Sequence, residues 1–168
     1  MAFRHLLVPT DFSEPANQAL RYAIEEAALH HARVTLLHVL PPDTRTDAHY
    51  VTGAPAETTQ GGVDPTVGRA AFLSYPEVVR RDRSEEALTQ LRDLAANAFP
   101  GPAEVAVALG HPADTIVRIA QERGADLIVM STHGRTGLQH VLLGSVAEKV
   151  VRLAPCPVLT VKGLAGSD

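Results

Sequence analysis

The segment from Met130 to Val150 contains the residues whose types and spacing are best suited to chemistry. Gly134 follows a predicted strand end, where a glycine lets the backbone pass close to a ligand. Gly144 and Ser145 open a predicted helix, whose first N–H groups and dipole favour an anion. The Ser145 hydroxyl could cap this helix or donate to a phosphate oxygen, and Arg135 adds a cation nearby. Together these residues predict a phosphate-binding site, although the glycines could instead only shape a turn.

Other residue types that could do chemistry are not spaced for it. The eight histidines show neither an H-x-x-x-H pattern nor Cys/His spacing, which argues against a dedicated transition-metal site. Cys156 is the single cysteine and lies between two prolines with no base nearby in sequence, so we expect a buried structural thiol. Neither Lys149 nor Lys162 belongs to a G-x-x-x-x-G-K-S/T loop, which excludes a Walker-type NTPase.

Composition limits the protein class. The 168 residues suffice for one domain with a substantial core. Hydrophobic residues make up 45% and charged residues 20%, which excludes general disorder, and a net charge of −4 argues against an electrostatic DNA-binding protein. The aliphatic runs are too short to span a bilayer, and the N-terminus lacks the apolar stretch of a secretory signal. Because a lone cysteine also favours a reducing compartment, we expect a cytoplasmic protein.

The elements that must position the candidate site alternate along the chain. The predicted strands are Phe3–Val8, Val34–Leu40, Glu104–Leu109, Asp126–Met130 and Val158–Val161. The predicted helices begin after a Ser13 cap, cover Pro76–Ala98, run from Pro112 to a Gly124 cap, and cover Ser145–Leu153. This alternation predicts a five-stranded parallel open α/β sheet with helices between the strands. Such sheets bind ligands where strands end, which selects Pro9–Asp11, Val39–Pro41, Leu109–Gly110 and Met130–Gly134.

Residues 43–75 show little periodicity and many glycines and prolines, so they predict a long surface excursion. This excursion could cover the ligand, contact a partner or be a tolerated insertion. The charged run Arg80–Arg83 indicates a solvated helix face that could pair with Glu85 and Glu86. We expect residues 1–168 to form one domain with a short flexible tail at 163–168.

Several motifs together resemble the universal stress protein family. Its ATP-binding branch carries G-x-x-G, nine residues and then G-S/T; here Gly134, Arg135–Leu143 and Gly144–Ser145 match, and Ser131 stands at the first glycine position. The phrases VPTDFS, LHV, GSVAEKV and APCPV, which begin at residues 8, 37, 144 and 154, are also typical of the family. The resemblance implies a Rossmann-like fold of the adenine nucleotide alpha hydrolase type with strand order 3-2-1-4-5.

The resemblance also implies an adenine-nucleotide site with Mg²⁺ or Mn²⁺ bound through the phosphates. Asp11 would contact the nucleoside, although from the residues alone it could simply cap the first helix. His133 could likewise be a solvated loop residue. By resemblance, the base would lie against Pro9, Thr10 and the main chain of Val39. The ribose and phosphates would lie against Met130, Ser131, His133, Gly134, Arg135, Gly144, Ser145 and Val146.

We therefore expect an ATP-binding protein with a regulatory, stress-response role. A slow ATPase or phosphotransferase that uses the same pocket is one alternative, and a nucleotide-independent interaction module is another. Whether ATP is hydrolysed stays open, because the sequence places no carboxylate next to the phosphate loop to orient water. The family dimerises through its last strand, so Val158–Val161 would form a homodimer interface. No nucleic acid or membrane insertion is expected, and an unknown protein partner stays open.

Overall fold

The computed structural model describes residues 2–42, 65–132 and 144–162. Its centre is one five-stranded sheet in which every neighbouring pair is parallel, with the order β3-β2-β1-β4-β5. This confirms the predicted fold class and strand order. The strands are β1 His5–Pro9, β2 Arg33–Leu40, β3 Ala103–Leu109, β4 Leu127–Ser131 and β5 Val158–Val161.

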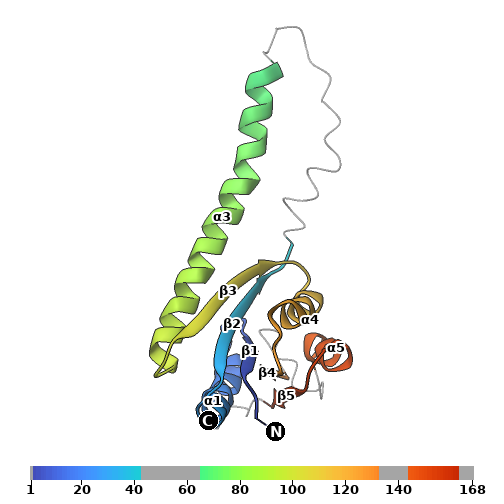
Figure 1. Cartoon of the computed structure of the whole chain (residues 1–168). Coiled ribbons are helices and arrows are strands. Elements are labelled where there is room, and N and C mark those ends of the chain that lie inside the picture. Colours follow the sequence, from blue (N-terminus) through green and yellow to red (C-terminus); the bar gives the residue numbers. More distant parts are fainter. Residues whose placement is uncertain (1, 43–64, 133–143, 163–168) are drawn as a thin grey trace, which may run out of the picture.

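Helices cover both faces of the sheet (Figure 1). On one face, α1 (Glu14–His30) and α3 (Pro65–Ala98) contribute Leu20 and Leu91 to a core with β1, β2 and β4. On the other face, α4 (Pro112–Arg123) and α5 (Ser145–Leu153) contribute Ile116 and Val150 to a second core. Two covered faces explain why the central strands are continuous apolar runs. None of the helices among the described residues is long and apolar enough to cross a membrane.

Local signals set several of the helix ends. The Ser13 hydroxyl accepts a hydrogen bond from the N–H of Ala16, as expected of an N-cap at the start of α1. Gly124 ends α4 in the left-handed conformation with φ +61°. Cys156 is half-buried against the second core, not fully buried as expected. Burial, and then the charge of Asp126, raise the pKa of its thiol.

The start of α3 corrects the sequence analysis. The helix begins at Pro65 and not at Pro76, so residues 65–75 are helical and do not belong to an irregular excursion. Proline is favoured at the first helical position, and the sequence offers two such prolines. The rest of the predicted excursion, residues 43–64, and the predicted tail at 163–168 lie outside the described residues.

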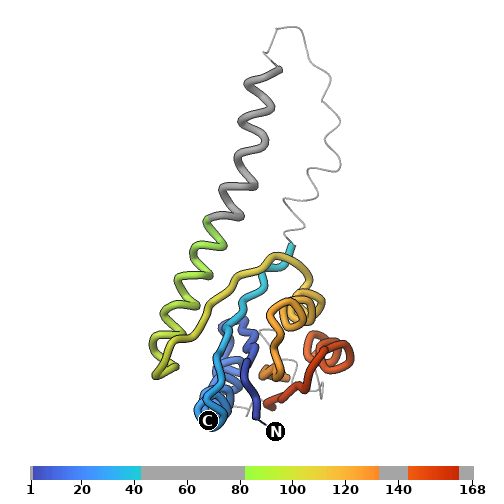
Figure 2. Tube along the Cα trace, in the orientation of Figure 1, coloured from blue at the N-terminus to red at the C-terminus, as the bar shows by residue number. Residues whose placement is uncertain are grey.

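The strand order creates a switch point at the middle of the sheet. β1 pairs with β2 on one side and with β4 on the other, so Leu6 lies opposite both Val34 and Leu127. The trace shows β1 and β4 side by side although they are far apart in sequence (Figure 2). Chain connections leave β1 and β4 in opposite directions, and this opens a crevice at their carboxyl ends.

Candidate functional site

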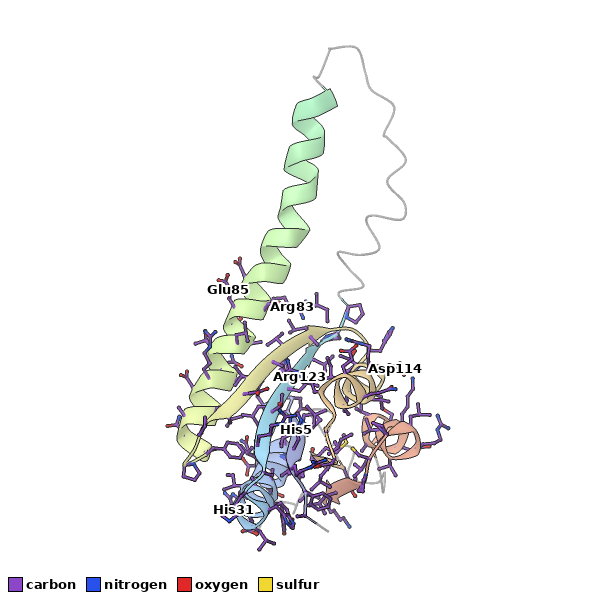
Figure 3. All side chains as sticks on the ribbon, in the orientation of Figure 1. His5, His31, Arg83, Glu85, Asp114 and Arg123 are labelled. Carbon is purple, nitrogen blue, oxygen red and sulfur yellow. The ribbon has the colours of Figure 1, made fainter. Side chains whose placement is uncertain are left out.

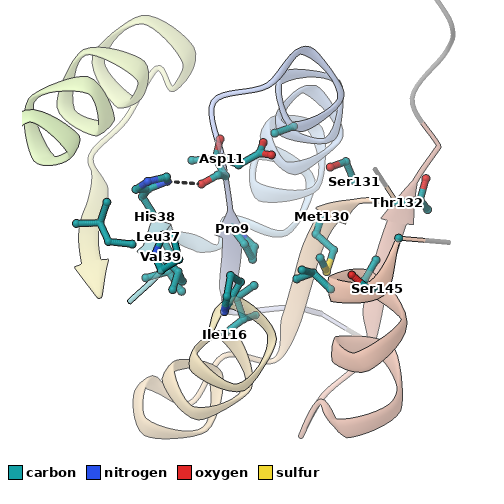
Figure 4. Close-up of a pocket in the computed structure, with 18 of the residues that line it drawn as sticks. Pro9, Asp11, Leu37, His38, Val39, Ile116, Met130, Ser131, Thr132 and Ser145 are labelled. Atoms are coloured by element: carbon teal, nitrogen blue, oxygen red, sulfur yellow. Dashed lines mark hydrogen bonds between the residues drawn. The ribbon is translucent and has the colours of Figure 1, made fainter. Parts of the chain in front are cut away.

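A cavity of about 540 Å³ lies at this carboxyl edge (Figure 4). The ends of β1, β2 and β4 form its floor, and the first residues of α4 and α5 and Arg83 of α3 line its sides. Its size is in the range of cavities that hold small molecules and cofactors. The lining residues are Pro9, Thr10, Asp11, Ala16, Leu37, His38, Val39, Leu40, Pro41, Arg83, Pro112, Ile116, Met130, Ser131, Thr132, Gly144, Ser145, Val146 and Ala147.

The turn between β1 and α1 holds Asp11 at the cavity wall. The Thr10 N–H donates to the carbonyl of Leu37 at 2.9 Å, and the Thr10 hydroxyl accepts from the N–H of Phe12 at 3.0 Å. The Asp11 carboxylate accepts from both the N–H and the hydroxyl of Ser13. Phe12 has a φ of +63°, which a residue with a side chain adopts only when its surroundings fix it. The helix cap is therefore Ser13, and Asp11 orders the turn from the cavity side.

His38 supports the same turn from β2. Its ring is buried, its Nδ1–H donates to the carbonyl of Thr10 at 2.8 Å, and its centroid lies 4.6 Å from that of the Phe12 ring. A carbonyl oxygen can only accept, so the proton in this bond belongs to Nδ1. Of these two neighbours, only Val39 was predicted to lie at the site. The signal available for His38 was its position at the end of a buried strand.

The N-terminus of α5 opens into the cavity. Gly144 is the N-cap, and its N–H donates to the carbonyl of Thr132 at 2.7 Å, while the Thr132 N–H donates to the carbonyl of Val161 at 2.9 Å. These two bonds tie the start of α5 to the ends of β4 and β5. Ser145 is the first helical residue, so it does not cap the helix. The first N–H groups of a helix have no intrahelical acceptor, so the turn that begins with Ser145 and Val146 can bind an anion.

Every predicted site residue that the structure describes lines the cavity. These are Pro9, Thr10, Asp11, Val39, Met130, Ser131, Gly144, Ser145 and Val146. His133, Gly134 and Arg135 lie outside the described residues. Arg83 was predicted to lie on a solvated helix face, and it lines the cavity instead.

The cavity lining carries few charged side chains. Among the described lining residues, Asp11 is the single carboxylate and Arg83 the single arginine or lysine. The end of β2 contributes Val39, Leu40 and Pro41, which are apolar. The cavity thus suits a ligand with an anionic group at α5 and a flat, weakly polar group near the ends of β1 and β2.

Comparison with known proteins identifies the family. The sequence model of the universal stress protein family matches residues 2–162. The chain belongs to the universal stress protein family. Universal stress protein MJ0531 of Methanocaldococcus jannaschii is 34% identical over 95% of this chain and 82% of its own length. Universal stress protein MJ0577 of the same organism is 30% identical over 95% of each chain.

Solved structures share this universal stress protein fold. The structure of MJ0577 superposes with a TM-score of 0.76 at 27% identity and covers 99% of this chain and 100% of that chain. A universal stress protein in complex with cAMP gives 0.60 at 23% identity, with 96% and 98% covered. One from Archaeoglobus fulgidus in complex with dAMP gives 0.50 at 24% identity, with 95% and 98% covered.

Proposed function

We propose that this universal stress protein binds ATP in the cavity and has a regulatory, stress-response role. The observation that carries the proposal is the cavity at the carboxyl edge of β1, β2 and β4, into which the N-terminus of α5 opens. A helix N-terminus stabilises phosphate charge, and the apolar end of β2 suits a purine. That two proteins of the same fold were solved with cAMP and dAMP agrees with an adenine nucleotide as ligand.

In this proposal the nucleotide runs along the edge of the sheet. The phosphates bind the N–H groups at the start of α5, with Gly144, Ser145 and Val146 closest. The nucleoside contacts the Asp11 carboxylate, and the base lies against Pro9, Thr10 and the main chain of Val39. Met130 and Ser131 face the ribose, and His133, Gly134 and Arg135 complete the phosphate side.

A divalent cation would bind mainly through the nucleotide. Mg²⁺ keeps several water ligands and usually takes few from the protein, so phosphate oxygens can hold Mg²⁺ or Mn²⁺ here. Among the described residues no cluster of three or more His, Cys, Asp or Glu side chains could hold a metal ion. The cation would reduce the charge of the phosphates that α5 binds.

We favour binding over turnover as the role of the site. Hydrolysis needs a group that orients water beside the terminal phosphate. In the described part of the chain, the one carboxylate that lines the cavity is Asp11, in the turn after β1 and not on α5, and Glu148 on α5 is exposed. ATP turnover by the pure protein that Gly144→Val abolishes would favour the ATPase alternative instead.

We also propose that residues 1–168 form a single cytoplasmic domain that pairs as a homodimer through β5. All the described strands belong to one sheet, and β5 is an edge strand of that sheet. Exposed edge strands are normally paired or protected, and a twofold axis is the commonest closed arrangement.

Calorimetric titration of nucleotide-stripped protein with ATP and Mg²⁺ tests the proposal, and we expect micromolar binding. Gly144→Val should abolish it, because the added side chain blocks the approach of phosphate to the start of α5. Gly144 has φ −65° and ψ 149°, an extended conformation that valine also adopts, so the effect should fall on the ligand.

Gly101→Val is the matched control, since a side chain at exposed Gly101 meets no atom within 4 Å of its Cβ. It should bind ATP as the unmodified protein does. Absence of ATP binding by folded unmodified protein would contradict the proposed function and favour the nucleotide-independent interaction module.

A further inference from the structure

Among the α3 side chains that the structure describes, Arg83 is the one that lines the cavity, and nothing in the family motifs accounts for it. Arg83, Ala87, Leu91 and Ala95 are spaced by four, so they follow one broad face of the helix. The last three are 5%, 0% and 9% exposed, and Leu91 and Ala95 belong to the core on this face of the sheet. Arg83 therefore continues the face of α3 that is in contact with the sheet.

The direction of α3 places Arg83 at the ligand-binding edge. The helix belongs to the crossover from β2 to β3, and in a parallel crossover the helix runs opposite to the strands. Its residues before the buried stripe therefore lie toward the carboxyl ends of the strands. Figure 3 shows Arg83 at this end and His5 and Arg123 toward the other.

Arg83 and the start of α5 line the cavity from opposite faces of the sheet. α3 packs on β3, β2 and α1, whereas α5 packs on the other face beside α4 and β5. The centres of β2 and β4 are two strand spacings apart, about 10 Å. In Figure 4, β3 and the helix above it lie on one side, and Ser145 lies on the other.

From this arrangement, and on the basis of the proposed function, we infer that Arg83 binds the base end of the nucleotide through the flat face of its guanidinium. Phosphates held at α5 leave the base near the end of β2, on the side of Arg83. There Val39, Leu40 and Pro41 supply apolar walls. A guanidinium is planar and weakly hydrated, so it stacks on an aromatic ring better than an ammonium does, and more strongly away from water. Arg83 is thus a residue that determines affinity for the nucleoside part.

The test compares ATP, ADP and AMP on the unmodified protein, Arg83→Met and Arg83→Lys, each with Mg²⁺ and each checked for folding by circular dichroism. Arg83→Met should weaken the binding of all three nucleotides by the same factor, about fivefold, because the lost contact does not involve phosphate. Arg83→Lys should resemble it, since lysine keeps the charge but not the plane. Arg92→Met, at an exposed arginine of the same helix, is the matched control and should leave the affinities for all three nucleotides unchanged.

The alternatives give different results. A loss that grows from AMP to ATP, or full recovery of ATP affinity in Arg83→Lys, would show that Arg83 binds phosphate and would overturn the inference. Unchanged affinity of Arg83→Met for all three nucleotides would overturn it as well, while the proposed function stands. If the folded unmodified protein binds none of them, both proposals fail.

Discussion

His5 is buried at the amino edge of the sheet, opposite the cavity (Figure 3). Its Nδ1–H donates to the carbonyl of Arg123 at 3.1 Å, and its Nε2 lies 2.9 Å from the hydroxyl of Thr35. The Thr35 hydroxyl lies 3.4 Å from the carboxylate of Glu104, which pairs with Arg123 at 3.0 Å. This network joins three strands to the end of α4 and leaves the imidazole little contact with water.

The burial of His5 predicts a stability that depends on pH. Burial first, and then the charge of Arg33, lower the pKa of His5 from its ordinary value of 6.5, although the hydrogen bond to Arg123 and the charges of Glu104 and Asp126 act in the other direction. The unfolded chain therefore binds a proton at a higher pH than the folded chain does. The free energy of unfolding should fall as the pH drops below about 6.5, by at most about 1.4 kcal/mol per pH unit from this group.

Urea unfolding at several pH values between about 7.5 and 5 measures this slope. His5→Gln should be less stable overall but should have a shallower slope, because the titrating group is gone. His111→Gln, at an exposed histidine, should keep the slope of the unmodified protein. Equal slopes in the unmodified protein and His5→Gln would refute the assignment to His5.

The spacing of residues in the sequence predicted the site residues at strand ends and helix starts better than those that reach the cavity through their side chains. Asp11 and Gly144 lie where a strand ends or a helix starts, and the topology of a parallel sheet brings such positions together. Arg83 reaches the cavity only because of how α3 packs on the sheet, whereas the place of His38 at the end of β2 was a signal in the sequence. That packing depends on contacts between distant segments, which local patterns do not encode.

At the scale of elements, the two ends of α4 depend on glycines in different ways. Gly110, between β3 and α4, has φ +144°, and a side chain there would collide with the Thr115 hydroxyl. Gly124 has φ +61°, but a side chain there would meet open space. Gly124→Ala should therefore cost about 1 kcal/mol of unfolding free energy from backbone strain alone. Gly110→Ala should cost about 3 kcal/mol, because the collision adds to the strain.

Gly101→Ala completes the series. It should change the unfolding free energy by less than about 0.5 kcal/mol, since this residue is exposed and its added Cβ meets no atom within 4 Å. Urea unfolding of the three variants at one pH gives the ranking. If Gly110→Ala were as stable as Gly101→Ala, the turn would have to shift without cost, contrary to this account.

Elements with a clear local signal at both ends were predicted with the correct bounds. α5 covers Ser145–Leu153 and β5 covers Val158–Val161, as expected from a glycine–serine start and flanking prolines. The start of α3 was wrong because Pro65 and Pro76 carry the same signal for a first helical residue. The interior proline removes a backbone donor, yet the surrounding helix continues past it.

At the scale of the molecule, alternating strands and helices indicate a parallel sheet but not the order of its strands. Buried apolar runs such as those of β1 and β4 indicate that both faces of the sheet are covered, but they do not indicate which strands are neighbours. The order 3-2-1-4-5 came from the family resemblance, and the structure confirms it. That order makes β5 an edge, which is the basis of the proposed dimer.

The hydrogen-bonding direction along β5 provides a sharp test of that dimer. The carbonyls of Pro157 and Val161 accept hydrogen bonds from backbone N–H groups of β4 and the residue after it. Because the hydrogen-bonding direction alternates along a strand, the backbone groups of Thr160 face away from β4.

Light scattering at tens of micromolar protein should give twice the monomer mass. Thr160→Pro should give a folded monomer, because it removes an outward N–H and leaves the pairing with β4 intact. Thr160→Ala keeps that N–H and should stay dimeric. A monomeric unmodified protein would refute the dimer, and a dimeric Thr160→Pro would move the interface away from β5.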